Sequence, residues 1–388
     1  MRYHSIVFAG LMMITAAFAN AQGTYDDAVV GYAYTSPSGS LQFENLYHRS
    51  GGDITVDHTS EGQYKIRFYG ASTQGSYIPM LAWPAADGGV CTISGFGPGL
   101  DFSHDPPTFR WVGVQCSDAL TVNPDDDWNQ VLLVDEGGPD GSNTSLAFVE
   151  SREAMPPGGS VDLSSENSTY NPGGGTTSLS RTGLGEYYVS MDGLGAVMPA
   201  DVNVYVAAFS DYSRSCRVAD WTLHFAGSDN ARVQVRCSGP SGPVDMRFVL
   251  LLTSTEPSSA SAASAKINGF SQPSEWTTVS GSAVHNPHGQ VQFRWDGDNH
   301  QIRFEWPSDQ PEGVAFVTSA YSQLRFCSST TAHRPPGGPA DYLQVNVNCF
   351  DFDGTLGVGT FTVLLTQVTP APPGDLIFSD RFAMGDSQ

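Results

Sequence analysis

The sequence predicts an all-β protein of three tandem antiparallel β-sandwich domains, each closed by one internal disulfide. Two observations carry this prediction. Apolar runs alternate with polar residues at period two, and Gly, Pro, Ser and Asp separate the runs, which is typical of short half-buried strands joined by tight turns. The same order of features also occurs three times along the 388 residues, so one domain of roughly 110 residues is repeated. A small barrel is the alternative, because closure leaves no mark in the sequence.

The repeat is most regular between Gly185 and Leu252. Two alternating strands there read Glu-Tyr-Tyr-Val-Ser-Met and Val-Asn-Val-Tyr-Val-Ala-Ala-Phe, two cysteine-bearing strands follow, and the copy ends in Arg-Phe-Val-Leu-Leu-Leu. In every copy an aromatic residue ends the second strand, six to eight residues before the first cysteine. These residues are Trp83, Phe209 and Tyr321. A unit of this length can bury its own core, so each copy is expected to fold as a domain.

The six cysteines lie two to a copy, 25, 21 and 22 residues apart, and none forms a C-x-x-C pair. In an exported chain this spacing favours disulfides over metal ligands. Six cysteines allow fifteen pairings, and the repeat favours the one in which each bond stays within a copy. The predicted disulfides are Cys91–Cys116, Cys216–Cys237 and Cys327–Cys349. Each is expected to stabilise its domain by about 3 kcal/mol, because it restricts the unfolded chain.

Residues 1–21 predict a cleaved secretory signal peptide. Arg2 gives a basic start, an apolar stretch runs from Ile6 to Phe18, and Ala19-Asn20-Ala21 forms a small-x-small cleavage site. The stretch is too short to span a bilayer, which disfavours the alternative of a membrane anchor, and no later stretch is long enough. We therefore expect a secreted or cell-surface protein. The predicted organisation is β domains at 23–134, 146–253 and 266–368, linkers at 135–145 and 254–265, and a Pro-rich spacer with a C-terminal tail at 369–388.

The chain is strongly acidic. Its formal charge is −22, and its two lysines are Lys65 and Lys266. An acidic surface repels phosphate backbones and anionic lipids, so nucleic acid is not expected as a partner. The expected partner is extracellular, with carbohydrate or an envelope component as the candidates.

Two common catalytic motifs are missing from the sequence. Neither the G-x-S-x-G elbow of serine hydrolases nor the H-E-x-x-H of zinc proteases occurs, so no catalytic residue, metal ligand or cofactor is assigned. His285 and His288 form an H-x-x-H, but a proline and a glycine beside them indicate a turn and not a metal-binding helix. Glu305 beside Trp306 is the most suggestive carboxylate for a glycosidase. The preferred interpretation is that Trp306 faces the core while Glu305 faces water.

Acidic clusters and tryptophans supply the remaining candidate sites. Calcium is the alternative to ordinary turn capping at three clusters, none of which has the ligand order of an EF-hand. The clusters are Asp125–Asp127, Asp296–Asp298 and Asp351–Gly354. Trp83, Trp128 and Trp221 occupy positions that conform to the repeat, which predicts core packing. Trp276 and Trp295 lie outside the shared pattern and are the candidate ligand-binding residues, because flat rings on a β surface suit sugar rings.

The second copy resembles a repeat found, often in tandem, in many secreted bacterial proteins. The features that carry this resemblance are Tyr187-x-Val, the strand ending at Phe209, Cys216-x-Val-x-x-Trp221, Val233-x-Val-x-Cys237, Gly242, Asp245 and Phe248. The third copy keeps the cysteines and Phe361 but has His300 at the tyrosine position, and the first copy departs most. The terminal Ile377-Phe378-Ser-Asp380-Arg381-Phe382 is similar to an Ile-Phe-x-Asp-Gly-Phe tail of exported bacterial proteins, with Arg381 replacing the glycine. The resemblance implies a secreted modular protein without an established activity.

The repeated scaffold therefore predicts a non-catalytic secreted or cell-surface protein whose loops bind an extracellular partner or glycan. Several units can engage one partner if the linkers allow it. The alternative is a secreted hydrolase acting on polysaccharide or peptide, with its site between units or in the divergent first unit. A deep pocket with convergent polar groups would favour the hydrolase, and shallow faces would favour the binding protein.

Overall fold

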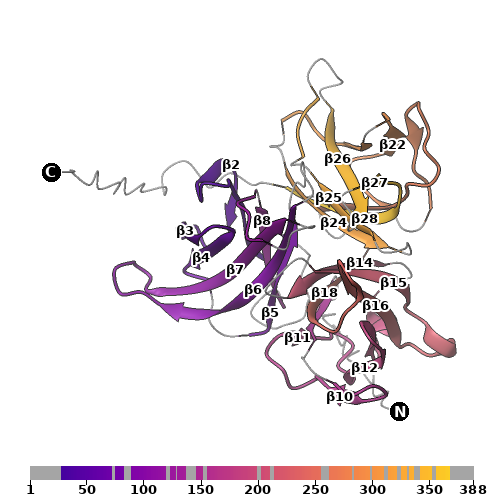
Figure 1. The fold of residues 1–388 in the computed structure, drawn as a ribbon, viewed down its shortest axis with the longest axis horizontal. Coiled ribbons are helices and arrows are strands. Elements are labelled where there is room, and N and C mark those ends of the chain that lie inside the picture. The colour runs from indigo at the N-terminus through magenta and orange to yellow at the C-terminus, as the bar shows by residue number, and fades with distance from the viewer. Residues whose placement is uncertain are drawn as a thin grey trace, which may run out of the picture.

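The computed structural model contains the three copies, called units 1, 2 and 3 (Figure 1). The described residues are 28–71, 75–82, 89–118, 123–127, 129–136, 146–151, 155–198, 202–209, 214–254, 262–281, 284–297, 299–309, 313–320, 325–329, 332–335, 341–351 and 355–367. The predicted signal peptide, the C-terminal tail, Trp83 and Trp128 lie outside these residues.

Strands are the main elements of the described chain. Unit 1 contains β1 (Val29–Thr35), β2 (Leu41–His48), β3 (Ile54–Ser60), β4 (Gln63–Tyr69), β5 (Tyr77–Ala82), β6 (Gly89–Leu100), β7 (Thr108–Asp118) and β8 (Asn129–Asp135). Unit 2 contains β9 (Leu146–Glu150), β10 (Ser160–Asp162), β11 (Thr169–Tyr170), β12 (Thr177–Gly183), β13 (Glu186–Met191), the short helix α2 (Leu194–Val197), β14 (Val202–Phe209), β15 (Ser215–Thr222), the 3-10 turn η1 (Phe225–Gly227), β16 (Ala231–Gly239), β17 (Gly242–Pro243) and β18 (Arg247–Ser254). Unit 3 contains β19 (Ala262–Asn268), β20 (Thr277–Thr278), β21 (Val284–His285), β22 (Val291–Trp295), β23 (His300–Glu305), β24 (Gly313–Ala320), β25 (Arg325–Ser329), β26 (Tyr342–Asp351), β27 (Leu356–Gly357) and β28 (Thr360–Gln367).

Each unit is a sandwich of two antiparallel sheets with a shared strand order, which confirms the predicted fold class. One sheet carries both cysteines and is called the disulfide sheet; the other is called the inner sheet. The inner sheets have the orders β2-β1-β8-β5, β11-β9-β18-β14 and β21-β19-β28-β24. The disulfide sheets have the orders β3-β4-β7-β6, β10-β12-β13-β16-β15 and β20-β22-β23-β26-β25.

Neighbouring units are joined at their sheet edges. The inner-sheet edge β14 of unit 2 pairs in parallel with β6 of unit 1, where Phe209 lies opposite Ile93. The inner-sheet edge β24 of unit 3 pairs in parallel with β15 of unit 2, where Ala320 lies opposite Val218. Hydrogen-bonded ladders therefore run from one unit into the next, which covers edges that would otherwise be open to pairing with another chain.

Burial differs between the two kinds of sheet. In several strands of the disulfide sheets, such as β13 and β23, every second residue is buried, so these strands have one half-open face. In the inner sheets both faces are covered, as in β18, where the six central residues are all buried. The prediction that the strands are half-buried is therefore wrong for the inner sheets.

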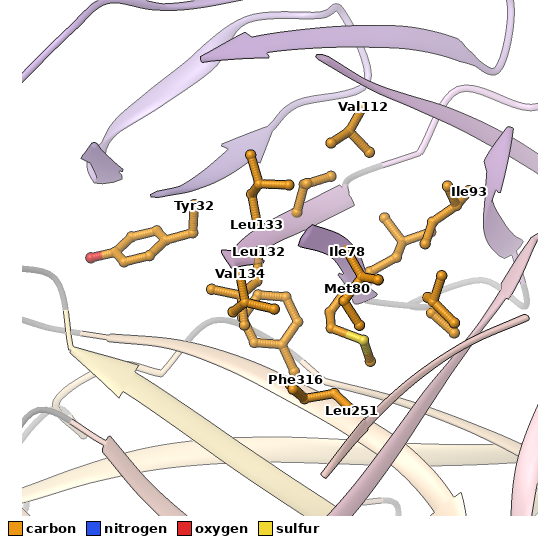
Figure 2. Packing of buried hydrophobic residues seen from close by; sticks show 14 of the residues in the cluster. Tyr32, Ile78, Met80, Ile93, Val112, Leu132, Leu133, Val134, Leu251 and Phe316 are labelled. Carbon is orange, nitrogen blue, oxygen red and sulfur yellow. The ribbon is translucent and has the colours of Figure 1, made fainter. Parts of the chain in front are cut away.

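The second face of each inner sheet is covered because the three inner sheets pack against one another. A single buried cluster contains Ile78 and Leu132 from unit 1, Leu251 from unit 2 and Phe316 from unit 3. Figure 2 shows these side chains as one packed group. The three sandwiches therefore share a central core, in addition to the core that each one has between its own two sheets.

Buried polar groups fix unit 2 against unit 3. The Asn203 side-chain amide donates to Ser264 Oγ at 2.7 Å, and the Tyr205 hydroxyl donates to the Val363 carbonyl at 3.2 Å. The Thr362 hydroxyl donates to the Val204 carbonyl at 3.0 Å. Buried hydrogen bonds of this kind specify one relative placement of the two units, because any other would leave the polar groups without partners.

The predicted linker at 254–265 is too long. Strand β18 includes Ser254, and β19 begins at Ala262, which pairs with Thr366 of β28. The Ala and Ser residues of this stretch resemble a linker by composition. Residues 262–265 belong to strand β19, and their small side chains fit the crowded interior, where Ala263 and Ala265 are fully buried.

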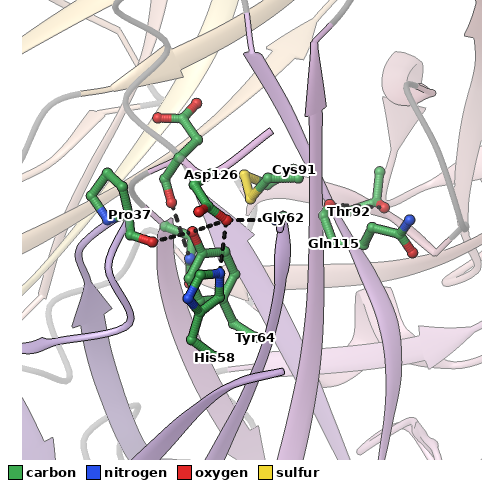
Figure 3. Close-up of a disulfide and its surroundings, with 11 residues drawn as sticks. Pro37, His58, Gly62, Tyr64, Cys91, Thr92, Gln115 and Asp126 are labelled. Atoms are coloured by element: carbon green, nitrogen blue, oxygen red, sulfur yellow. Dashed lines mark hydrogen bonds and ion pairs between the residues drawn. A yellow bond between two sulfur atoms is a disulfide. The ribbon is translucent and has the colours of Figure 1, made fainter. Parts of the chain in front are cut away.

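All three predicted disulfides are present. Each joins directly opposite residues of adjacent antiparallel strands, as in Cys216 of β15 and Cys237 of β16. The other two are Cys91–Cys116, seen in Figure 3, and Cys327–Cys349. Each disulfide therefore ties an edge strand of its sheet to the next strand.

Candidate functional site

The outer faces of the disulfide sheets are the sheet surfaces most open to ligands, because the inner sheets are covered on both sides. In unit 3 this face carries Trp276, one of the two predicted ligand-binding residues. The half-buried Trp276 ring lies against two cations from the neighbouring strands. Its centroid is 4.6 Å from the guanidinium carbon of Arg294 on β22 and 3.9 Å from that of Arg303 on β23.

Amide side chains extend the unit 3 face across the sheet. Arg294 Nε donates to Gln301 Oε1 at 2.7 Å, and Arg303 Nε donates to Gln344 Oε1 at 3.2 Å. Gln344 in turn donates to Asn346 Oδ1 at 3.0 Å. Burial, followed by the nearby Arg294 charge, lowers the pKa of Arg303. The face is therefore a row of planar polar groups beside one aromatic ring, and we call it the Trp276 face.

The second predicted residue, Trp295, belongs to a different environment. Its ring packs edge-on against His300 at 4.5 Å, and its backbone N–H donates to the Pro273 carbonyl at 2.7 Å. His300 is fully buried, and burial lowers its pKa. Trp295 and Trp276 do not form one site, since residues 294 and 295 of β22 point to opposite faces of the sheet.

Unit 1 has an aromatic surface at the corresponding face. Trp111 and Phe109 of β7 extend their rings over three glycines of β6. Gly97 and Gly99 lie directly opposite Trp111 and Phe109 in the ladder, and the Trp111 ring also reaches Gly95. A Cβ atom added at Gly95 would lie 2.9 Å from Trp111 Cη2, and one added at Gly97 would lie 3.2 Å from Trp111 Nε1. The two rings therefore occupy the space that side chains of β6 would fill.

Cations flank this aromatic surface. The Lys65 ammonium is 4.6 Å from the Trp111 ring centroid, and the Arg67 guanidinium carbon is 5.7 Å from that of Phe109. We call the surface formed by these four side chains over the three glycines the Trp111 platform. Sequence reasoning did not single it out. The available signal was the Gly-x-Gly-x-Gly run, which removes three side chains from one face of a strand.

Unit 2 repeats the cation–ring pair with its members exchanged. Tyr188 of β13 occupies the position of Lys65, and Arg232 of β16 occupies the position of Trp111. The Arg232 guanidinium carbon is 3.9 Å from the Tyr188 ring centroid and 4.4 Å from that of Phe225. All three units therefore place an aromatic ring against a cation on the outer face of the disulfide sheet.

The acidic cluster at 125–127 contributes a structural tie. Asp126 Oδ1 accepts hydrogen bonds from the Gly62 backbone N–H at 2.6 Å and the Tyr64 hydroxyl at 3.4 Å, and it lies 2.8 Å from His58 Nε2 (Figure 3). In unit 2, Asp245 plays the same part. These contacts explain Asp126 as a cap of the hairpin, which is the preferred interpretation from the sequence.

The other predicted polar sites are separated from one another. His288 packs edge-on against the buried Trp306 at 4.6 Å, whereas His285 lies in β21. Trp306 is buried, and Glu305 accepts hydrogen bonds from the Gln290 backbone N–H at 2.7 Å and the Tyr342 hydroxyl at 3.0 Å. The core interpretation of Trp306 is therefore confirmed.

Other predicted residues are placed as follows. Asp296 accepts hydrogen bonds from the Asn299 backbone N–H at 2.7 Å and the Gln301 amide at 2.6 Å, whereas Asp298 and Asp353 lie outside the described residues. Trp221 packs against the unit 2 core, as predicted. Within the described ranges, no group of three or more His, Cys, Asp or Glu residues could hold a metal ion.

An open cavity of 310 Å³ lies between β19 and the segment that leads into β20. Lys266 is the titratable member of its lining, and its ammonium lies 4.6 Å from the ring centroid of Trp221 in unit 2. Burial lowers the pKa of Lys266. The cavity therefore lies beside the contact between units 2 and 3.

Comparison with protein-family models, curated proteins and solved structures finds no match for this chain. Among the described residues, no helix is long and apolar enough to cross a membrane.

Proposed function

We propose that the protein is a secreted or cell-surface, non-catalytic binding protein that recognises glycan through the Trp276 face. The observation that carries this proposal is the Trp276 ring beside the Arg294 and Arg303 guanidinium groups on one sheet face. An indole ring offers a flat apolar surface to the C–H face of a sugar ring. Planar guanidinium and amide groups offer donors and acceptors in fixed directions, which suits pairs of sugar hydroxyls.

The location outside the cytoplasm is part of this proposal. Three disulfides are compatible with an oxidising compartment, where such bonds persist. The predicted signal peptide at 1–21 points to the same compartment. The resemblance to tandem repeats of secreted bacterial proteins is also consistent with it.

The shared core shapes how more than one unit could bind. Because the inner sheets pack together, the three outer faces are held at fixed positions with respect to one another. Fixed sites gain avidity only for a partner whose own spacing matches theirs. The predicted linkers would let the units move freely and bind one polymer independently. The shared core holds the units together, so the proposal does not include this mode of binding.

The test is binding to a panel of neutral and charged polysaccharides, with the chain as it is and with Trp276→Ala. The Trp276→Ala variant is expected to lose most of its affinity for the glycan that the unchanged protein binds. Phe270→Ala is the matched control, because Phe270 is also an aromatic residue of unit 3 and is 55% exposed. Equal affinity of Trp276→Ala and the unchanged protein would exclude the Trp276 face. Release of reducing sugar from the bound glycan would instead support the hydrolase alternative.

A further inference from the structure

We propose that the Trp111 platform is a second binding site, and that its ligand is an anionic polysaccharide. The site lies in unit 1, and the Trp276 face lies in unit 3. Its ligand class is argued from unit 1 alone, although the general idea of glycan recognition rests on the proposed function.

The shape of the platform favours a flat ligand. Gly95, Gly97 and Gly99 leave this part of the outer face of β6 without side chains, and the rings of Trp111 and Phe109 fill that space. The Phe109 ring is buried and supports the platform from one end, whereas the Trp111 ring is half-buried. Trp111 is therefore the ring on which a sugar can stack.

The charge of the platform selects an anion. Asp57 lies opposite Lys65 in the β3–β4 ladder, yet its carboxylate pairs with Arg67. Among the described residues, no carboxylate pairs with the Lys65 ammonium, which lies 4.6 Å from the Trp111 ring centroid. A cation over an aromatic ring, with no paired carboxylate in the part of the chain that the structure describes, is complementary to the acidic group of a sugar that contacts the indole.

The acidic character of the whole chain does not oppose this assignment at physiological salt. Charges farther away than about 8 Å are largely screened at this ionic strength, so the groups that line the platform determine the local attraction. The charged groups of the platform and its edge are Lys65, Arg67, Asp57 and Asp101. Both carboxylates interact with Arg67, so Lys65 supplies the positive charge that attracts an anion.

The experiment measures binding of the full chain to three polymers at physiological ionic strength. The polymers are polygalacturonate, which carries carboxylates, sulfated dextran and neutral dextran. Comparison of the first two distinguishes carboxylate from sulfate. Comparison of the two dextrans shows the effect of charge on one backbone. The unchanged protein is expected to bind at least one of the anionic polymers and to bind dextran much more weakly. Lys65→Gln and Trp111→Ala are each expected to lower the affinity about tenfold, which corresponds to about 1.4 kcal/mol.

Lys266→Gln is the matched control, because the Lys266 ammonium also lies 4.6 Å from a tryptophan ring centroid. Its affinity for the polymer is expected to stay unchanged. Equal binding to dextran, or unchanged affinity in Lys65→Gln, would overturn the assignment. If Trp276→Ala alone abolished binding to the anionic polymers, this inference would fail and the proposed function would stand. If only the two unit 1 variants lost binding, this inference would stand, and the Trp276 face would be shown not to bind these polymers.

Discussion

A single aspartate ties together the hairpin of unit 2. Asp245 Oδ1 accepts hydrogen bonds from the Gly185 backbone N–H at 2.9 Å, the Tyr187 hydroxyl at 3.1 Å and Arg181 Nε at 2.9 Å. Arg181 Nη2 donates to Asp245 Oδ2 at 2.5 Å. Burial, together with this carboxylate, raises the pKa of Tyr187 to about 12. The tie therefore joins both strands of the hairpin and the loop after Cys237.

Removal of this carboxylate is expected to destabilise the protein. Asp245→Ala should lower the free energy of unfolding by about 3 kcal/mol, because it leaves a half-buried guanidinium and a backbone N–H without their acceptor. Tyr187→Phe should cost less, about 2 kcal/mol, because it removes one donor to the carboxylate and the acceptor of the Met246 backbone N–H. Urea unfolding measures both values. A loss in Asp245→Ala no greater than that in Tyr187→Phe would show that the carboxylate does not organise the hairpin.

His48 makes stability depend on pH. Burial lowers its pKa from 6.5 to about 4, so the unfolded state takes up the proton first as the pH falls. The stability contributed by neutral His48 is therefore fully present above pH 6.5 and is lost as the pH falls towards 4. His48→Gln should flatten the dependence of the unfolding free energy on pH in this window. An unchanged slope in the variant would assign the pH dependence to other groups, such as His300.

At the scale of elements, the Trp111 platform depends on the pairing of β6 with β7. Gly99 lies opposite Phe109 in this ladder, and a Cβ at residue 99 would overlap the Phe109 ring. Gly97 leaves more room, since its added Cβ would lie 3.2 Å from Trp111 Nε1. The two glycines therefore tolerate a methyl group to different degrees.

This difference predicts an order of stability for two alanine variants. Gly99→Ala should cost about 2 kcal/mol, because it displaces the buried Phe109 ring, whereas Gly97→Ala should cost less. Urea unfolding gives the two free energies, and the near-ultraviolet circular dichroism reports on the rings. A larger cost for Gly97→Ala than for Gly99→Ala would contradict the described packing.

The sequence was most informative about elements that repeat. Alternating strands and the cysteine spacing predicted the disulfide sheets and all three bonds. The first four residues of β19 were assigned to a linker because a run of Ala and Ser is typical of linkers. In the structure these small residues lie in a crowded interior. The Trp111 platform was missed because it requires that Gly97 and Trp111 be opposite each other. A single sequence does not show which residues of β6 and β7 lie opposite each other.

At the scale of the whole molecule, the shared core accounts for the inner strands. Runs such as Val131–Val134 and Val249–Leu252 are continuously apolar, a pattern that indicates strands covered on both faces. The apolar pattern of a strand does not reveal which part of the protein covers the second face of its sheet. The structure shows that the other units provide it, with Phe316 and Leu251 in the same cluster as Leu132.

Because the three sandwiches share one core, we expect them to unfold together. Differential scanning calorimetry tests it through the ratio of the calorimetric to the van't Hoff enthalpy of unfolding. A single cooperative unit gives a ratio of about 1, whereas three independent domains of similar stability give about 3. The shared core predicts the lower value. Three separable transitions, or a ratio near the higher value, would contradict it.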